Sequence, residues 1–295
     1  MSTATQTTVT VRGEQLVETE SALRANARRA RRRRKTRLWV ARLAFAVFII
    51  GGWQLFTERG WVSPFFYGQP SLIWQSLVQL FTEGTEFGSI WVDIATTLKE
   101  ALYGFFLGAG TGIVVGLLLG QNRFLSDVLS PYIKIVNAIP RIILGSIFLV
   151  AFGLGTFPKV LLAAVLVFFI VFFNAFQGVR EVDPNLVANV KVLGASPLQV
   201  ARHVTIPSAL TWIIASLHTA FGFAIIGALV AEVLGSQRGV GLIISQAQGR
   251  LDPNTVFAAM AIMAVITLAA EYLLTLLEKR VLSWRPPSQA ESAGI

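Results

Sequence analysis

The chain has 295 residues, of which 54% are hydrophobic and 14% are charged, and its mean hydropathy is +0.64. A composition this apolar excludes an ordinary soluble domain and predicts a protein whose solvent is a lipid bilayer. The net charge is +9, and the sequence has two histidines and no cysteine, which excludes disulfides, thiol catalysis and cysteine-ligated metal sites.

Residues 1–37 form a basic tail that directly precedes the first apolar segment. Lys and Arg beside a membrane span mark its cytoplasmic side, so the tail predicts a cytoplasmic N-terminus held against anionic membrane lipid. Nucleic-acid binding is the alternative, but no aromatic or folded module accompanies the basic run, and we expect no nucleic-acid partner. The basic residues nearest the apolar segment are Arg24, Arg28, Arg29, Arg31, Arg32, Arg33, Arg34, Lys35 and Arg37.

About six segments are apolar and long enough to cross a bilayer, which takes roughly 20 residues each. They lie near 38–56, 94–119, 138–157, 159–178, 209–234 and 256–277. We expect an all-α, polytopic membrane helix bundle in residues 38–285, followed by a short C-terminal tail at 286–295. The charge pattern predicts that both termini are cytoplasmic in a multi-pass protein.

The second apolar segment carries a glycine at every fourth position. These glycines are Gly104, Gly108, Gly112, Gly116 and Gly120. Positions four apart form a groove on a helix, and a groove without side chains lets a neighbouring backbone approach closely. Tight helix packing is the plain interpretation, and a sliding surface during transport is the alternative. A phosphate-binding loop is excluded, because the Lys-Ser/Thr partner of such a loop is missing.

Charged residues inside apolar segments are candidates for a transport pathway, because charge in hydrocarbon is costly and usually faces the interior of a bundle. Arg141 follows Pro140 in the third segment, where it is placed to attract an anion, and Asn137 is the second pathway candidate. The alternative is that Arg141 pairs with another helix or reaches the cytoplasmic headgroups. For Glu232, hydrogen-bonded packing is favoured over a proton relay.

The polar stretch at 183–207 lies between two long apolar segments and begins with the signals of a short helix. Asp183 is a good N-cap, and Pro184 fits the first helical position, where a missing N–H costs nothing. Gly194 is expected to end this helix, because glycine adopts the left-handed C-cap conformation without strain.

A second short helix is expected immediately afterwards. Ser196 is its N-cap and Pro197 its first residue, and Gln199 stands at the capping-box distance from Ser196. Pro207 is expected to end it. The stretch is therefore predicted to fold as a compact helix-turn-helix elbow.

This elbow resembles the "EAA" loop of permease subunits of bacterial ATP-binding-cassette (ABC) importers, whose pattern is E-A-A-x-x-x-G, nine residues, then I-x-L-P. Gly194 is followed after nine residues by VTIP at 204–207, so the glycine, the spacing and the proline match. The head of the motif differs, since Ala188, Asn189 and Val190 stand where the family has Glu-Ala-Ala.

The resemblance extends from about Gly68 to Arg280. Within this range the sequence is similar to the nitrate, sulfonate and taurine branch of these importers, in the segments YGQPSLIWQSL, EVDPNLV and GSQRGVGLI. It implies cytoplasmic ABC ATPase subunits, a second permease copy, identical or paralogous, and an extracytoplasmic solute-binding protein as partners. It also implies a re-entrant or gate-supporting segment in the stretch after Leu234. The residues expected to dock the ATPase are Asp183, Pro184, Ala188, Asn189, Lys191, Gly194, Ala195, Ser196, Pro197 and Pro207.

No nucleophile–base pair and no cluster with metal-ligand spacing is visible in the sequence. We therefore expect no catalytic residue, metal or cofactor in this chain, and ATP hydrolysis in a separate subunit. The resemblance implies a permease of the bacterial inner membrane that passes a small solute of the nitrate, sulfonate or taurine kind by alternating access. The alternatives are an ion-coupled secondary transporter, whose ion site would lie at a broken helix, and a non-transporting membrane scaffold.

Overall fold

The structure is a computed structural model that describes residues 32–281. The chain divides into two compact units, Met1–Pro64 and Phe65–Ile295. In the first unit, the helix Arg32–Glu58 is long and apolar enough to cross a bilayer, and the expected first span at 38–56 lies within it. The basic residues of the tail before Arg32 lie outside the described residues.

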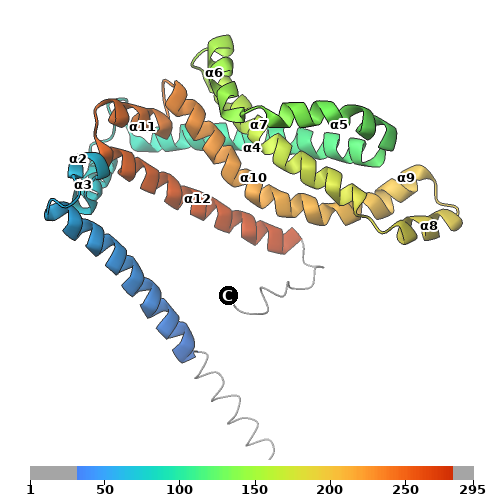
Figure 1. The fold of residues 1–295 in the computed structure, drawn as a ribbon, viewed down its shortest axis with the longest axis horizontal. Coiled ribbons are helices and arrows are strands. Elements are labelled where there is room, and N and C mark those ends of the chain that lie inside the picture. Colours follow the sequence, from blue (N-terminus) through green and yellow to red (C-terminus); the bar gives the residue numbers. More distant parts are fainter. Residues whose placement is uncertain (1–31, 282–295) are drawn as a thin grey trace, which may run out of the picture. The chain divides into compact units, whose positions relative to one another are not determined.

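The second unit is built from helices, whose order along the chain is shown in Figure 1. The short helix α2 (Pro64–Tyr67) stands at the boundary between the two units. The helices that follow are α3 (Pro70–Thr82), α4 (Ile90–Gln121), α5 (Arg123–Ala138), α6 (Arg141–Phe152), α7 (Thr156–Arg180), α8 (Pro184–Val192), α9 (Pro197–Val200), the π-helical turn η1 (Ala201–Thr205), α10 (Ile206–Leu234), α11 (Val240–Gly249) and α12 (Pro253–Val281).

Three long helices, α4, α7 and α10, pack against one another and form the core of this unit (Figure 1). Small residues line their contacts, and Ala101, Ala163 and Ala228 are completely buried. Because no bulky side chain separates the helix axes at these positions, the backbones approach closely, as is typical of helix contacts in membranes.

The glycine stripe of α4 lies against α7. A Cβ atom added to Gly112 would stand 2.9 Å from the carbonyl oxygen of Phe168 and 3.1 Å from the amide nitrogen of Phe172. Both are backbone atoms and cannot turn aside as a side chain can. The other members of the stripe are equally close to α7, and they are Gly104, Gly108, Gly116 and Gly120. In the structure the stripe is therefore a packing surface between two helices.

The expected third span at 138–157 is not a single straight helix. Of these residues α6 covers only Arg141–Phe152, and it meets α5, which ends at Ala138, at a bend of 82°. Pro140 has no N–H for a helical hydrogen bond, and Ile139 before it takes an extended conformation with φ −68° and ψ 127°. With 12 residues, α6 is only about 18 Å long and is too short to cross a bilayer alone. The described residues thus hold five helices that are long and apolar enough to cross a bilayer, or six such spans if this bent pair counts as one.

The end of the second unit that lies away from α8 and α9 is formed by α3, α11 and the first turns of α12 (Figure 1). Here α3 packs against α12, and α11 packs against α10, α12 and α4. The segment after Leu234, expected to be re-entrant or gate-supporting, contains α11, whose 10 residues cannot cross a bilayer.

Candidate functional site

Gly194 ends α8 in a left-handed conformation with φ +88°, as expected from the sequence. Its N–H donates to the carbonyl oxygen of Lys191 at 2.9 Å, and the N–H of Ala195 donates to the carbonyl oxygen of Val190 at 3.1 Å. This pair of bonds is a Schellman motif, which satisfies two carbonyl groups at the end of the helix and reverses the chain. No atom lies within 4 Å of the position of a Cβ at Gly194, so backbone conformation and not space requires glycine here.

Side-chain caps begin both helices of the elbow, and the sequence prediction of these caps is confirmed. Asp183 Oδ1 accepts a hydrogen bond from the Asn185 N–H at 2.8 Å. In the capping box of α9, the Gln199 N–H donates to Ser196 Oγ at 3.3 Å, and the Ser196 N–H donates to Gln199 Oε1 at 2.8 Å. The turn between α8 and α9 is therefore fixed by the chain itself before any partner binds.

The expectation that Pro207 ends the second elbow helix is wrong, because α9, η1 and α10 form one continuous run, Pro197–Leu234. Pro207 lies in the first turn of α10, directly after the π-helical turn. In that turn the Ile206 N–H donates to the carbonyl oxygen of Ala201, five residues back. The wider turn makes room before a residue that has no N–H and whose ring would clash in a regular helix.

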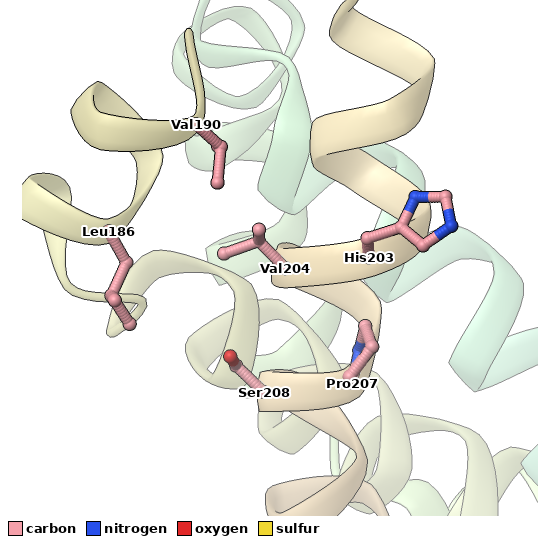
Figure 2. A pocket seen from close by; sticks show the side chains of 6 residues that line it. All are labelled: Leu186, Val190, His203, Val204, Pro207 and Ser208. Carbon is pink, nitrogen blue, oxygen red and sulfur yellow. The ribbon is translucent and has the colours of Figure 1, made fainter. Parts of the chain in front are cut away.

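The elbow encloses a shallow apolar hollow of about 380 Å³ between α8 and the start of α10. Figure 2 shows Val190 of α8 and Val204 of η1 pointing toward one another across it. The residues that line the hollow are Leu186, Val190, His203, Val204, Pro207 and Ser208.

Large apolar side chains on the elbow point into solvent. The exposed fraction is 87% for Val192, 85% for Leu193 and 76% for Leu198. A polar loop that displays apolar side chains is typical of a protein interaction surface. Among the residues expected to dock the ATPase, Ala195 is half-buried and the others are exposed.

The two pathway candidates lie on either side of the bend between α5 and α6. Arg141 Nη2 donates a hydrogen bond to Asn137 Oδ1, and the guanidinium carbon lies 4.7 Å from the centre of the Phe169 ring. Within the described residues, no carboxylate forms an ion pair with Arg141, and its Nε is buried without a hydrogen-bond partner. Within the part of the chain that the structure describes, the guanidinium is thus held by an amide and an aromatic ring.

A second set of polar residues, which sequence reasoning missed as a group, lies at the opposite end of α10 from the elbow. Three consecutive N–H groups, of residues 239–241 at the start of α11, donate to side chains of other helices. Their acceptors are, in order, Asp93 Oδ1 at 3.1 Å, Thr97 Oγ1 at 3.0 Å and Glu232 Oε2 at 2.7 Å. We call this arrangement of Asp93, Thr97 and Glu232 the trans cap of α11.

Charged residues that are almost completely buried surround the trans cap. Glu100 is 2% exposed and lies against Glu232, and Lys159 is 1% exposed and interacts electrostatically with both carboxylates. The Lys159 ammonium also donates to the carbonyl oxygens of Leu154 and Gly155. Charges placed within otherwise apolar runs, as Glu100 and Lys159 are, could have signalled this cluster in the sequence.

Comparisons with known proteins agree on the kind of protein to which this geometry belongs. A family model described as a binding-protein-dependent transport system inner membrane component matches residues 111–283. The chain is 33% identical over 261 residues to the aliphatic sulfonates transport permease protein SsuC of Bacillus subtilis, with 88% of this chain and 93% of that protein covered.

Two further relatives carry different solute names. The chain is 30% identical to the riboflavin transport system permease protein RibX of Chloroflexus aurantiacus, with 79% of this chain and 85% of that protein covered. It is 27% identical to the taurine transport system permease protein TauC of Escherichia coli, with 81% and 87% covered. Among solved structures, an inward-facing MetNI methionine ABC transporter matches the fold with a TM-score of 0.51 at 20% identity, and the match covers 66% of this chain and 93% of that chain.

Proposed function

The chain belongs to the family of binding-protein-dependent transport system inner membrane components, and we propose that it carries a small sulfonate-type anion into the cell by alternating access. It is a type I ABC permease of the nitrate, sulfonate and taurine branch and a multi-pass protein of the inner membrane. As a permease subunit it is a non-catalytic component, so the energy for transport enters through contacts with a partner.

The elbow at 183–207 is the part of this proposal that carries the coupling to ATP. Its two helices are capped by their own side chains, and its exposed apolar residues offer a partner a preformed surface, which reduces the entropy lost on binding. A cytoplasmic ABC ATPase is the partner that the family implies. Ala188 stands where the family motif has glutamate. In this proposal, apolar contacts of residues such as Leu193 and Leu198 with the ATPase replace the acidic contact.

In the proposed cycle, ATP binding draws the elbows of two permease copies together, and hydrolysis resets them. For the elbow to meet an ATPase it must lie in the cytoplasm, and the N-terminus and the C-terminus then lie there too. This orientation places α3 and α11 on the outer side, where a solute-binding protein delivers its solute. Because α10 continues the elbow without a break, any movement of the docking surface is applied directly to a core helix.

Arg141 supports the choice of an anionic solute. An arginine at a break between two helices, which forms no ion pair with a carboxylate among residues 32–281, attracts negative charge into the bundle. The sulfonate group of the aliphatic sulfonates and of taurine, the solutes named for two of the relatives, carries such a charge, whereas the riboflavin named for a third relative is a neutral heterocycle.

The test is reconstitution of the chain into proteoliposomes with its native ATPase and solute-binding protein. We expect uptake of taurine or an alkanesulfonate that requires both ATP and the binding protein. Uptake of riboflavin alone would contradict the proposal of an anionic solute, but it would still support the assignment of the chain to an importer. Uptake driven by an ion gradient without ATP would identify a secondary transporter instead, and an assembled complex that moves none of these solutes would favour a scaffold.

A further inference from the structure

The helix α11 does not cap its own N-terminus. Its N-cap residue is Gly239, which has no side chain to accept the free N–H groups of the first turn. The trans cap supplies all three acceptors, from α4 and from α10. The position of α11 is therefore set by two other helices and not by its own sequence.

The trans cap is closed tightly around the backbone of α11. A Cβ at Gly241 would stand 2.6 Å from the carbonyl oxygen of Leu229 and 2.9 Å from Glu232 Oε2. The Thr97 hydroxyl also donates to Glu232 Oε1 at 2.7 Å, so α4 and α10 are joined to each other at the point where both hold α11. Glu232 and Asp93 are completely buried, which removes water as a competing partner for these bonds.

The other end of α10 is the elbow. The continuous run Pro197–Leu234 has 38 residues, and at 1.5 Å per residue it is about 57 Å long. Glu232 lies in its last turn, whereas the capping box of Ser196 lies at its start. One helix therefore joins the proposed docking surface to the trans cap.

Close packing against α7 near both ends of α10 prevents α10 from bending independently of this neighbour. A Cβ at Gly227 would stand 2.7 Å from the Cα of Ala163, and one at Gly178 would stand 3.1 Å from the Cα of Ala209. Two helices in backbone contact at both positions, α7 and α10, respond to a force as a single body, because packed interiors have low compressibility.

We infer that Glu232 and Thr97 are positioning residues that fix α11 to α10, so that movement of the elbow is transmitted along α10 to α11 at the far end of the bundle. This inference rests on the proposed function, since it takes the elbow as the docking surface. It adds a transmission path, whose last step is the set of hydrogen bonds from Thr97 and Glu232 to α11, which we call the joint.

The joint is tested by hydrogen exchange on the whole chain in nanodiscs, measured on peptides that cover residues 238–244. Thr97→Val keeps the shape of the side chain but removes the hydroxyl, and we expect exchange of these amides to rise about tenfold because a buried hydrogen bond is lost. Thr97→Ser restores the hydroxyl and is expected to restore the wild-type rate. Thr96→Val is the matched control, because the Thr96 hydroxyl bonds to the carbonyl of Val92 in its own helix.

Unchanged exchange in Thr97→Val would overturn the joint. If that variant does not fold, Thr97→Ala removes the same hydroxyl without a second methyl group, and the same comparison with Thr97→Ser decides the question. These measurements need no partner, so they are independent of whether the proposed function holds.

Transmission is tested in the complex with the native ATPase and solute-binding protein. We expect Thr97→Val to assemble normally and to keep its basal ATPase rate, but to lose most of the stimulation by the solute-binding protein, while Thr97→Ser keeps it. Full stimulation despite fast exchange at α11 would overturn the transmission path. Failure of the wild-type chain to bind any ABC ATPase would instead overturn the proposed function and leave the exchange result standing.

Discussion

Gly112 of α4 faces the backbone of Phe168 in α7, so that a Cβ on this glycine would stand 2.9 Å from the Phe168 carbonyl oxygen. Gly112→Leu should therefore push the two helices apart or prevent their packing. We expect a lower melting temperature in detergent and loss of transport. Gly110→Leu is the matched control on the same helix, because nothing lies within 4 Å of a Cβ at Gly110. Equal melting temperatures for the two variants would contradict the packing surface.

Gly194→Val tests the left-handed turn between α8 and α9. A β-branched residue at φ +88° should cost roughly 1–2 kcal/mol and misdirect the elbow. ATPase co-purification and uptake should fall, while membrane insertion survives. Gly194→Asn is the control, because asparagine tolerates this conformation better than valine. Wild-type co-purification of the valine variant would show that the turn is not needed for docking.

Leu198→Asp tests the exposed apolar surface of the elbow. Leu198 is 76% exposed, so the stability of the isolated chain should not change, whereas a carboxylate buried in an interface should weaken ATPase binding about tenfold or more. The control is Leu251→Asp at the other end of the bundle, where Leu251 is 64% exposed. If both variants retain the ATPase in a pull-down assay, the elbow surface is not the docking site.

Arg141 is proposed to attract the solute, and two substitutions separate this role from a structural one. Arg141→Gln should reduce uptake per assembled complex, and Arg141→Lys should keep part of it, because charge persists without the planar guanidinium group. A structural role predicts instead that Arg141→Gln lowers the melting temperature and subunit yield. Uptake that equals wild type after normalisation to assembled complex would remove Arg141 from the pathway.

Lys159→Met tests the buried charges beside the trans cap. Without the ammonium group, Glu100 and Glu232 lose the buried cation that interacts with both, and we expect the chain to be destabilised, measured as a loss of folded protein on heating or in denaturant. The double variant Lys159→Met/Glu100→Gln removes one charge of each sign and should recover much of this loss. Additive effects of the two substitutions would show that the two side chains do not interact.

The elbow could be predicted from the sequence because its signals are local. Asp183, Ser196 and Gln199 each cap a helix within three residues of their own position, so chain order alone brings the partners together. The packing role of the glycine stripe could also be predicted from the sequence, because glycines at every fourth position form one groove of a helix whatever the rest of the fold is.

The bend and the trans cap could not be predicted in the same way. A proline inside an apolar run either kinks a helix or ends it, and the choice at Pro140 depends on packing around α5 and α6. Thr97 and Glu232 are 135 residues apart, and the sequence around either residue does not predict that the two side chains meet. The start of α11 at Gly239 has no local cap, so its stability comes from helices that the local sequence does not describe.

The exposed valine and leucines of the elbow also bear on how the cell controls the amount of this subunit. In the proposed orientation, a copy without its partner would present Val192, Leu193 and Leu198 to the cytoplasm, where quality-control proteases and chaperones recognise apolar surface. A copy whose elbow is covered would escape them. The lifetime of the subunit should therefore follow the supply of the proposed ATPase partner, so that the two components are kept in balance after synthesis without a separate regulator.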